Sequence, residues 1–191
     1  MFFREKQRYK VVGRFQYCKM FSYFYEMEIK IRPYKVVDVD TIVAILNYYI
    51  ANSTSLYDYK PRTFDEQKNI FKEKINKGFP VIVATIDDRI VGFGYYSEFR
   101  FREAYKFTVE HSIYVLPNEL GNGIGKQLLQ HLILLAKKQK LHTMIGVIDS
   151  ENDNSISFHE QFGFKIVGTI KESGYKFDRW LHSVFMQLLL H

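Results

Sequence analysis

A single carboxylate stands within an alternating run, TVEHSIYV, at residues 108–115. Because side chains alternate between the two faces of a strand, Glu110 is expected to share a face with Ser112 and Tyr114, and His111 to lie on the opposite face. A carboxylate in such a position can take a proton from an amine, so Glu110 is a candidate general base. The alternative is a solvated glutamate on an edge strand. We interpret His111 as structural.

Three glycines follow this run, at Gly121, Gly123 and Gly125, and a segment with helical spacing comes directly after them. A helix N-terminus has N–H groups without partners and the positive end of the helix dipole, and glycines let the backbone close around an anion. The turn is therefore a candidate pyrophosphate seat. No Lys-Ser/Thr pair follows at the Walker spacing and no acidic residue is placed for a ribose, which excludes a P-loop and a Rossmann fingerprint. A merely structural turn is the alternative.

Hydrophobic spacing and turn residues predict the elements that position these groups. In chain order we expect a strand at 28–34, a helix around 42–50, a helix from 63 to about 78, two strands within 80–99, the strand at 108–115, a helix to about 140, a strand at 143–148, a short helix ending at 163, a strand from 165 and a last strand within 180–190. The order β-α-α-β-β-β-α-β-α-β-β indicates one mixed α/β domain over residues 27–191.

The expected helix ends have local signals. Asp38 or Asp40 is placed to cap the first helix. Thr63 and Glu66 have the spacing of a capping box for the second helix, and Gly78 is placed to end it.

Composition limits the classes of function. The chain has 191 residues and a formal net charge of +6, of which residues 1–26 carry +4, because six Lys and Arg residues stand there against two Glu. The basic excess thus belongs to this leader, and no nucleic-acid partner is expected for the body. We interpret the leader as upstream translation, with Met20 or Met27 as the start, or as a disordered extension. The alternative is a segment whose aromatic and basic residues dock on nucleic acid or lipid.

The other compositional signals are negative. Cys18 is the only cysteine, so no intrachain disulfide can form and a reducing, cytoplasmic compartment is expected. No stretch approaches the roughly 18 apolar residues that span a bilayer, so no membrane partner is expected. The six histidines are dispersed, so we expect no metal site.

The glycine turn has the spacing of a known motif. Residues 120–125, LGNGIG, resemble the Arg/Gln-x-x-Gly-x-Gly/Ala motif of the GNAT superfamily of acyl-CoA N-acetyltransferases, and residues 151–164 resemble its second motif, Asn-x-x-Ser followed by an aromatic residue and Gly-Phe. The resemblance implies acetyl-CoA as the cofactor. It assigns to the cofactor residues Tyr114, Val115, Leu120, Gly121, Asn122, Gly123, Ile124, Gly125, Lys126, Asn152 and Ser155. Leu120 departs from the motif, which removes one polar side chain.

The segments at 104–115, 158–164 and 174–190 resemble the phosphinothricin N-acetyltransferase branch, particularly its amino-acid and methionine-sulfoximine acetyltransferases. This resemblance implies that Glu110 is the general base, and that a backbone N–H near Val115, at a bulge in its strand, holds the thioester oxygen. His159 is implied as the general acid, or as a hydrogen-bonding partner of the acceptor. The resemblance also suggests a homodimer.

The acceptor's carboxylate calls for a guanidinium, which can bind it with two hydrogen bonds. Arg100 and Arg102 are both candidates, and we favour Arg100. Tyr57 and Tyr105 are expected to wall the side-chain pocket. His182 replaces an aspartate that is usual in the branch, which puts the support of that wall in question.

Together these patterns predict an acetyl-CoA-dependent N-acetyltransferase that acts on the α-amine of small amino acids such as phosphinothricin, methionine sulfoximine or methionine sulfone. Direct transfer without an acyl-enzyme is expected. The alternatives are a GNAT enzyme with another acceptor (a protein N-terminus, a polyamine or an aminoglycoside) and a non-catalytic module that binds CoA or an anionic surface.

Overall fold

The computed structural model describes residues 28–191, and the expectations about the leader, Cys18, Met20 and Met27 fall outside this range. The helices and strands, in chain order, are β1 Lys30–Pro33, α1 Val39–Asn52, α2 Phe64–Asn76, β2 Val81–Ile86, β3 Arg89–Glu98, β4 Thr108–Val115, α3 Ile124–Lys138, β5 Thr143–Asp149, α4 Asp153–Glu160, β6 Lys165–Lys176 and β7 Arg179–Leu189. This is the order expected from the sequence, and the mixed α/β fold class is confirmed.

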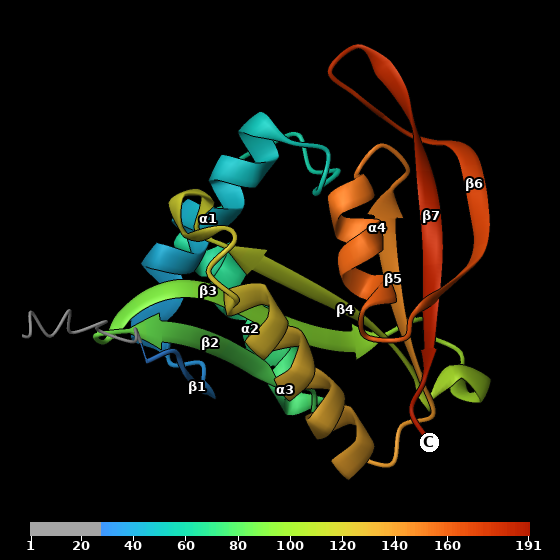
Figure 1. Ribbon diagram of the computed structural model, residues 1–191. Coiled ribbons are helices and arrows are strands. Elements are labelled where there is room, and N and C mark those ends of the chain that lie inside the picture. Colours follow the sequence, from blue (N-terminus) through green and yellow to red (C-terminus); the bar gives the residue numbers. More distant parts are fainter. Residues whose placement is uncertain (1–27) are drawn as a thin grey trace, which may run out of the picture.

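The seven strands form one sheet in the order β1-β2-β3-β4-β5-β7-β6 (Figure 1). Only β4 and β5 are parallel neighbours, and every other adjacent pair is antiparallel. A parallel pair needs a crossover, and α3 provides it. The two strands that meet in parallel are therefore the strand with Glu110 and the strand that follows the glycine turn and α3.

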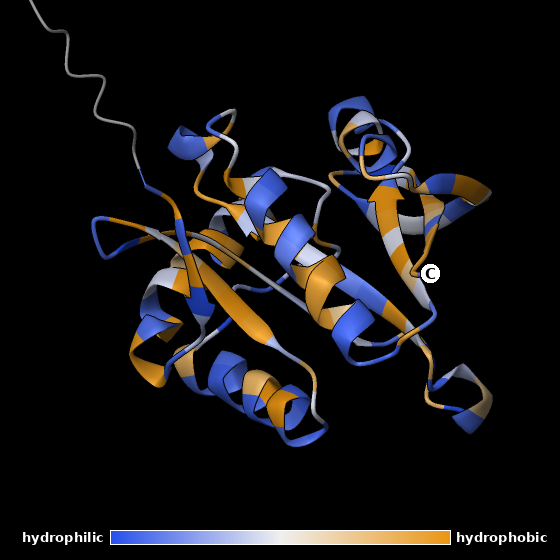
Figure 2. Ribbon diagram, turned by 60° about the horizontal axis from the view of Figure 1, so that its bottom comes forward, coloured by the Kyte–Doolittle hydropathy of each residue, from blue (hydrophilic) through white to orange (hydrophobic). Residues whose placement is uncertain are grey.

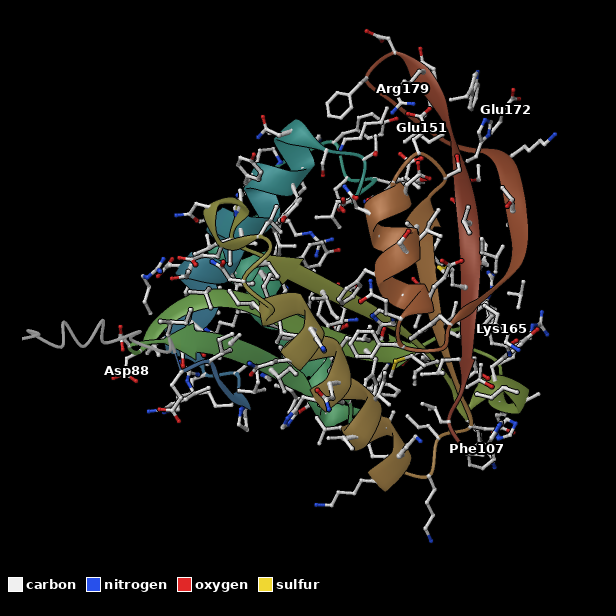
Figure 3. The ribbon with its side chains drawn as sticks, viewed as in Figure 1. Asp88, Phe107, Glu151, Lys165, Glu172 and Arg179 are labelled. Carbon is white, nitrogen blue, oxygen red and sulfur yellow. The ribbon has the colours of Figure 1, made fainter. Side chains whose placement is uncertain are left out.

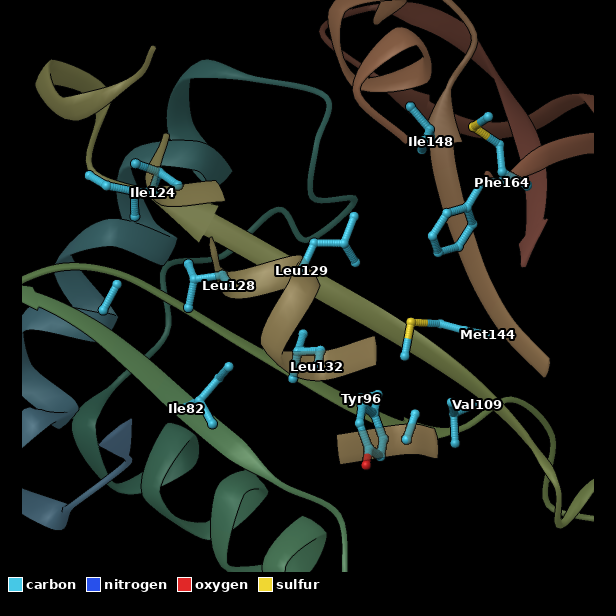
Figure 4. Packing of buried hydrophobic residues seen from close by; sticks show 14 of the residues in the cluster. Ile82, Tyr96, Val109, Ile124, Leu128, Leu129, Leu132, Met144, Ile148 and Phe164 are labelled. Carbon is cyan, nitrogen blue, oxygen red and sulfur yellow. The ribbon is translucent and has the colours of Figure 1, made fainter. Parts of the chain in front are cut away.

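Helices cover both faces of the sheet. On one face α1 and α2 bury a cluster with Phe93 and Tyr114. On the other face α3 buries Leu128, Leu129 and Leu132 against the sheet (Figure 4). The helices show both hydrophobic and hydrophilic colour, as expected for helices with one buried side (Figure 2). Each face of β4 therefore meets a different helical layer.

Local signals set several ends as expected. The Thr63 hydroxyl accepts the N–H of Glu66 at 3.3 Å, and the Glu66 carboxylate accepts the N–H of Thr63 at 2.8 Å, which confirms the capping box. Gly78 follows α2 with φ +83°. The turn between β2 and β3 is made by Asp87 and Asp88, both with positive φ, as a tight hairpin requires.

The expected cap at Asp38 is wrong in its chemistry. Asp38 stands at the N-cap of α1 but makes no hydrogen bond to the helix. Its buried carboxylate accepts instead from the Arg32 guanidinium, at 2.7 and 2.8 Å, and from the N–H of Lys35 at 2.7 Å. Burial alone would raise the pKa of Asp38, but the Arg32 guanidinium and the N–H of Lys35 lower it below its ordinary value, so the carboxylate stays ionised. Its bonds tie β1 to the start of α1.

In the part of the chain from residue 28 onward, no helix has the length and apolar character needed to cross a membrane. The same residues contain no group of three acidic, histidine or cysteine side chains that could hold a metal ion.

Candidate functional site

The strands β4 and β5 separate soon after they meet. They pair only between Thr108–Glu110 and Thr143–Ile145, and they diverge beyond those residues (Figure 1). We call the gap between β4 beyond Glu110 and β5 beyond Ile145 the fork. A strand whose neighbour leaves has peptide groups that a ligand can use, so the fork is a place where an extended ligand can add to the sheet.

Hydrogen-bond alternation decides which groups of β4 face the fork. Leu116 donates its N–H to the carbonyl of Val91 at 2.8 Å, and the register with β3 is regular along β4. The even-numbered residues of β4 therefore bond to β3, and the N–H groups of Ile113 and Val115 turn toward the fork. The expected bulge is absent from this ladder, because the pairing of β3 with β4 has no register shift. Divergence of β5, and not a bulge, leaves the N–H of Val115 on the open side.

Two tyrosines lie beside this end of β4. The hydroxyl of Tyr49 donates to the carbonyl of Val115 at 2.8 Å and so fixes the strand end. Tyr114 is buried, and its ring stacks on Phe93 with 5.2 Å between centroids. By the same alternation the peptide groups of Tyr114 bond to β3. The structure therefore brings Val115 to the fork, while Tyr114 packs under α1.

The glycine turn directly precedes α3. Gly121 has φ +85° and Gly123, the N-cap of α3, has φ +78°, a region that favours glycine. An added Cβ at either position would meet nothing within 4 Å, so the space above the turn is open. No side chain caps α3 and no acidic residue stands in its first turn, which leaves the first N–H groups and the dipole for an anion. The turn fits a pyrophosphate.

A buried carboxylate braces this turn. Glu119 accepts hydrogen bonds from the Arg89 guanidinium and, at 3.1 Å, from the Asn122 amide. These donors lower the pKa of Glu119, so it remains ionised. Leu120 is 60% exposed and offers no polar group, and Ile124 is buried in the core. The Asn122 amide is thus engaged by Glu119, and an anion would depend on main-chain N–H groups.

The remaining residues assigned to the cofactor stand on α3 and α4. Gly125 of α3 faces both α4 and β4, since its added Cβ would be 3.7 Å from Phe158 and 3.8 Å from Val115, while Lys126 is exposed. Asn152 caps α4, because its Oδ1 accepts the N–H of Ser155 at 3.0 Å. The start of α3 therefore lies close to the end of β4 and to Phe158 of α4.

His159 has a defined tautomer. Its Nδ1 lies 2.6 Å from the carbonyl oxygen of Ser155, and because a carbonyl only accepts, Nδ1 carries the proton. Burial lowers the pKa of His159, which keeps the ring neutral near pH 7. The lone pair then sits on Nε2, so the ring is arranged to accept a hydrogen bond. This arrangement favours the hydrogen-bonding role expected for His159 over the general-acid role.

His111 stacks on His159, with 5.1 Å between ring centroids and 29° between planes. It lies on the face opposite Glu110, as expected from strand alternation, and packs against Phe164. Both rings approach Gly146 of β5, where an added Cβ would be 3.3 Å from His111 Nε2 and 3.4 Å from His159 Cδ2. Burial, with a smaller contribution from His159, lowers the pKa of His111 to about 3. The pair is therefore neutral.

Glu110 lies on the α1 and α2 face, directly opposite Ser97 of β3. It is half-buried, and within residues 28–191 it takes part in no ion pair. Burial raises the pKa of Glu110, and the positive charges of Arg100 and then Lys74 act against that rise. A carboxylate with a raised pKa is a better proton acceptor than an exposed one. Lys74 was not expected here, although its place on the buried side of α2 was a usable signal.

The loop between β3 and β4 carries the expected carboxylate-binding residues. The Arg100 guanidinium lies over the ring of Phe99 at 5.0 Å, and Tyr105 meets the same ring edge-on at 5.9 Å. Arg102 lies over Phe101 instead, and both arginines are exposed. Of the two arginines only Arg100 acts on the pKa of Glu110, so Arg100 lies nearer to Glu110 than Arg102 does, and Tyr105 shares the Phe99 ring with Arg100.

Tyr57 is held from the far end of the chain. Its hydroxyl is 3.2 Å from Ser183 Oγ of β7, and its ring lies so close to Gly174 of β6 that an added Cβ would be 2.5 Å from it. The buried Lys176 donates to the carbonyls of Ser53 and Leu56, at 2.8 and 2.6 Å. The loop between α1 and α2 is thereby fastened to the β6–β7 hairpin.

The hairpin itself is braced at two places. Arg179 forms an ion pair of 2.6 Å with Glu151, which precedes α4, and the two lie together in Figure 3. His182 accepts the N–H of Glu172 through Nδ1 at 2.8 Å, and Glu172 has φ +51°. His182 therefore supports the irregular turn of β6 in place of the aspartate usual in the branch.

Known proteins share this architecture. The acetyltransferase (GNAT) family profile matches residues 43–164. The chain is 38% identical over 165 residues to an L-methionine sulfoximine/L-methionine sulfone acetyltransferase of Pseudomonas paraeruginosa, over 86% of this chain and 96% of that protein. The crystal structure of an N-acetyltransferase from Staphylococcus aureus Mu50 has a TM-score of 0.84 and 41% identity, over 86% of this chain and 99% of that one.

A GNAT superfamily phosphinothricin acetyltransferase from Sinorhizobium meliloti, solved in complex with AcCoA, has a TM-score of 0.83 and 34% identity, over 85% of this chain and 89% of that one. The chain belongs to the acetyltransferase (GNAT) family and is an N-acetyltransferase that uses acetyl-CoA.

Proposed function

We propose that the enzyme acetylates the α-amine of small amino acids of the methionine sulfoximine, methionine sulfone and phosphinothricin type. The similarity to proteins named for these acceptors supports the substrate class. The observation that carries the proposal is the half-buried Glu110, which has no ion-pair partner within residues 28–191 and lies near the Arg100 guanidinium. A carboxylate and a guanidinium together suit an amino acid, which has one charge of each sign.

The proposed cofactor contacts follow from the open backbone groups. The main-chain N–H groups of residues 121–126 hold the pyrophosphate, and the polar edges of Asn152 and Ser155 line the cofactor arm. The N–H of Val115 faces the fork and is placed to polarise a carbonyl oxygen there. Bound acetyl-CoA supplies an acetyl group activated as a thioester.

Glu110 handles the proton of the acceptor. An α-amine is mostly protonated at neutral pH and must lose a proton before its lone pair can attack a carbonyl carbon. Glu110 takes that proton, directly or through a water. Arg100 binds the acceptor carboxylate, with Arg102 as the less favoured candidate, and Tyr57 and Tyr105 wall the side chain.

His159 acts in this proposal as a hydrogen-bond acceptor through Nε2. Its Nδ1 proton is held by the Ser155 carbonyl, so it orients a donor without giving up a proton. Transfer is direct, since the only cysteine, Cys18, belongs to the leader.

We also propose that residues 27–191 form the N-acetyltransferase domain and that the enzyme is a homodimer. Ile166, Val167 and Ile170 are more than half exposed on β6, the edge strand of the sheet, which is a surface that a second copy can cover. Sedimentation equilibrium measures the mass directly, and a monomer at micromolar concentration would contradict the dimer.

The function is tested by following free thiol while the full-length enzyme is mixed with acetyl-CoA and a panel of amino acids, polyamines and aminoglycosides. Methionine sulfoximine, methionine sulfone or phosphinothricin should give the highest kcat/KM. The Glu110→Gln variant should lower kcat by a factor of about 10² or more while it still binds CoA. CoA binding by calorimetry without turnover of any amino acid would refute the proposed acceptor class.

A further inference from the structure

A second cation lies on the Glu110 face of the sheet. Lys74 follows Phe71 by three residues on α2 and shares its buried side of the helix. The Lys74 side chain is half-buried, and its ammonium lies 4.6 Å from the centre of the Tyr95 ring. It donates a hydrogen bond to Ser97 Oγ at 3.0 Å. Lys74 thus reaches from the helix down to the sheet instead of extending into water.

This position brings Lys74 close to the proposed base. Ser97 is the residue of β3 directly opposite Glu110, and partners of this kind have Cα atoms about 5.5 Å apart. Glu98, the other carboxylate that acts on Lys74, already forms an ion pair of 2.5 Å with Lys77. Within the described residues neither Lys74 nor Glu110 has an ion-pair partner. Two half-buried groups of opposite charge therefore face the same space without pairing.

An α-amino acid has the two charges that could pair with Lys74 and Glu110. Its ammonium and its carboxylate are attached to one carbon, so it can meet an acidic and a basic group at once. Building on the proposed function, we propose that Lys74 binds the carboxylate of the acceptor, together with Arg100, and so turns the acceptor's α-ammonium toward Glu110. Lys74 is then a specificity-determining residue that favours amino acids over simple amines.

The electrostatic surroundings agree with this role. Burial lowers the pKa of Lys74, the positive charges of Lys77 and Arg62 lower it further, and the negative charges of Glu98 and Glu110 raise it. An ammonium that loses hydration and lacks an ion-pair partner is stabilised by an arriving carboxylate. If Lys74 served only to cover the core, its ammonium would not be placed where the carboxylate of a ligand could stabilise it.

The test compares Lys74→Met with Lys72→Met, which removes an exposed lysine from the same helix. With methionine sulfone as acceptor, Lys74→Met should raise the acceptor KM by about tenfold to a hundredfold, the worth of a hydrogen bond between charged groups. Its kcat at saturating acceptor, measured at alkaline pH where Glu110 is ionised with or without the Lys74 charge, and its KM for acetyl-CoA should stay near those of the wild type. Lys74→Arg, which keeps the charge, should recover part of the loss, and Lys72→Met should show none.

A second substrate separates carboxylate binding from a structural effect. The amine that remains when methionine sulfone loses its carboxylate should react, or inhibit if its turnover is too slow to follow, equally in the wild type and in Lys74→Met. Equal losses on both compounds, or an unchanged KM for the amino acid, would overturn the role of Lys74. A wild type that acetylates no amino acid refutes the proposed function first, and the role of Lys74 falls with it.

Discussion

Replacing Gly174 by alanine is expected to displace Tyr57 from the proposed acceptor wall. The new Cβ would lie 2.5 Å from Tyr57 Cε2 and 2.8 Å from Cδ2, whereas ordinary contacts begin at 3.4 Å. The ring must therefore withdraw by about 1 Å, because carbon atoms cannot approach so closely. The ring has little freedom to tilt instead, since the neighbouring loop carbonyls of Ser53 and Leu56 are fixed by Lys176.

The expected rise in the acceptor KM is estimated from the hydrogen bond between Tyr57 and Ser183, which such a movement breaks. The Tyr57 hydroxyl is already 3.2 Å from Ser183 Oγ, so a shift of this size separates them. A neutral hydrogen bond contributes about 1 kcal/mol, which corresponds to roughly a fivefold rise in the acceptor KM. Overpacking should also lower the free energy of unfolding by about 1–3 kcal/mol. The KM for acetyl-CoA should not change, because the glycine turn is not involved.

Initial rates with varied methionine sulfoximine at saturating acetyl-CoA, and then the reverse, separate the two constants. Gly168→Ala on the same strand is the matched control, since its added Cβ would meet nothing within 4 Å. An unchanged acceptor KM in Gly174→Ala, or the same rise in Gly168→Ala, would refute the contact between Tyr57 and the acceptor.

Three further results are expected. Burial raises the pKa of Glu110 above the ordinary 4.5, so the ionised carboxylate is lost as pH falls through that raised pKa, and kcat/KM should fall with it. The residual kcat/KM of Glu110→Gln should lack this fall. The same fall in both enzymes would assign it to another group. Gly123→Ala places a methyl group at φ +78° and should lower the free energy of unfolding by about 1–2 kcal/mol. It should also weaken CoA binding, measured by calorimetry. Full CoA affinity in this variant would argue against the proposed anion seat. The pKa of His111 is about 3 in the folded protein and 6.5 in the unfolded chain, so protons bind the unfolded chain first as pH falls. Between pH 7 and pH 5 the free energy of unfolding, measured with urea, should therefore fall by about 2 kcal/mol more in the wild type than in His111→Phe. Equal falls in the two proteins would contradict the buried neutral ring.

The parts of the fold with local signals were predictable from sequence. The capping box of Thr63 and Glu66 and the turn at Asp87 and Asp88 depend only on residues a few positions apart, and both are present. Asp38 shows where this reasoning fails. Its carboxylate could accept hydrogen bonds either from the N–H groups of α1 or from Arg32, six residues earlier on β1. It bonds to Arg32.

At the candidate site the sequence could predict which face of β4 each residue occupies, but not how distant segments meet. Alternation along one strand sufficed to separate Glu110 from His111, because that depends on one strand alone. The fork depends on where β5 stops pairing with β4, which is a relation between distant segments. Lys74 was overlooked because a helical lysine usually extends into solvent, although its spacing from Phe71 placed it on the buried side of α2.

The fastening of Tyr57 also sets an order of assembly. The Lys176 ammonium bonds to the carbonyl of Ser53, 123 residues earlier, and Ser183 bonds to Tyr57, 126 residues earlier, so both anchors are synthesised long after the loop that they hold. The glycine turn and Glu110 are synthesised well before them. A chain that stops short of β7 would therefore have its glycine turn and Glu110, but no Ser183 to hold Tyr57.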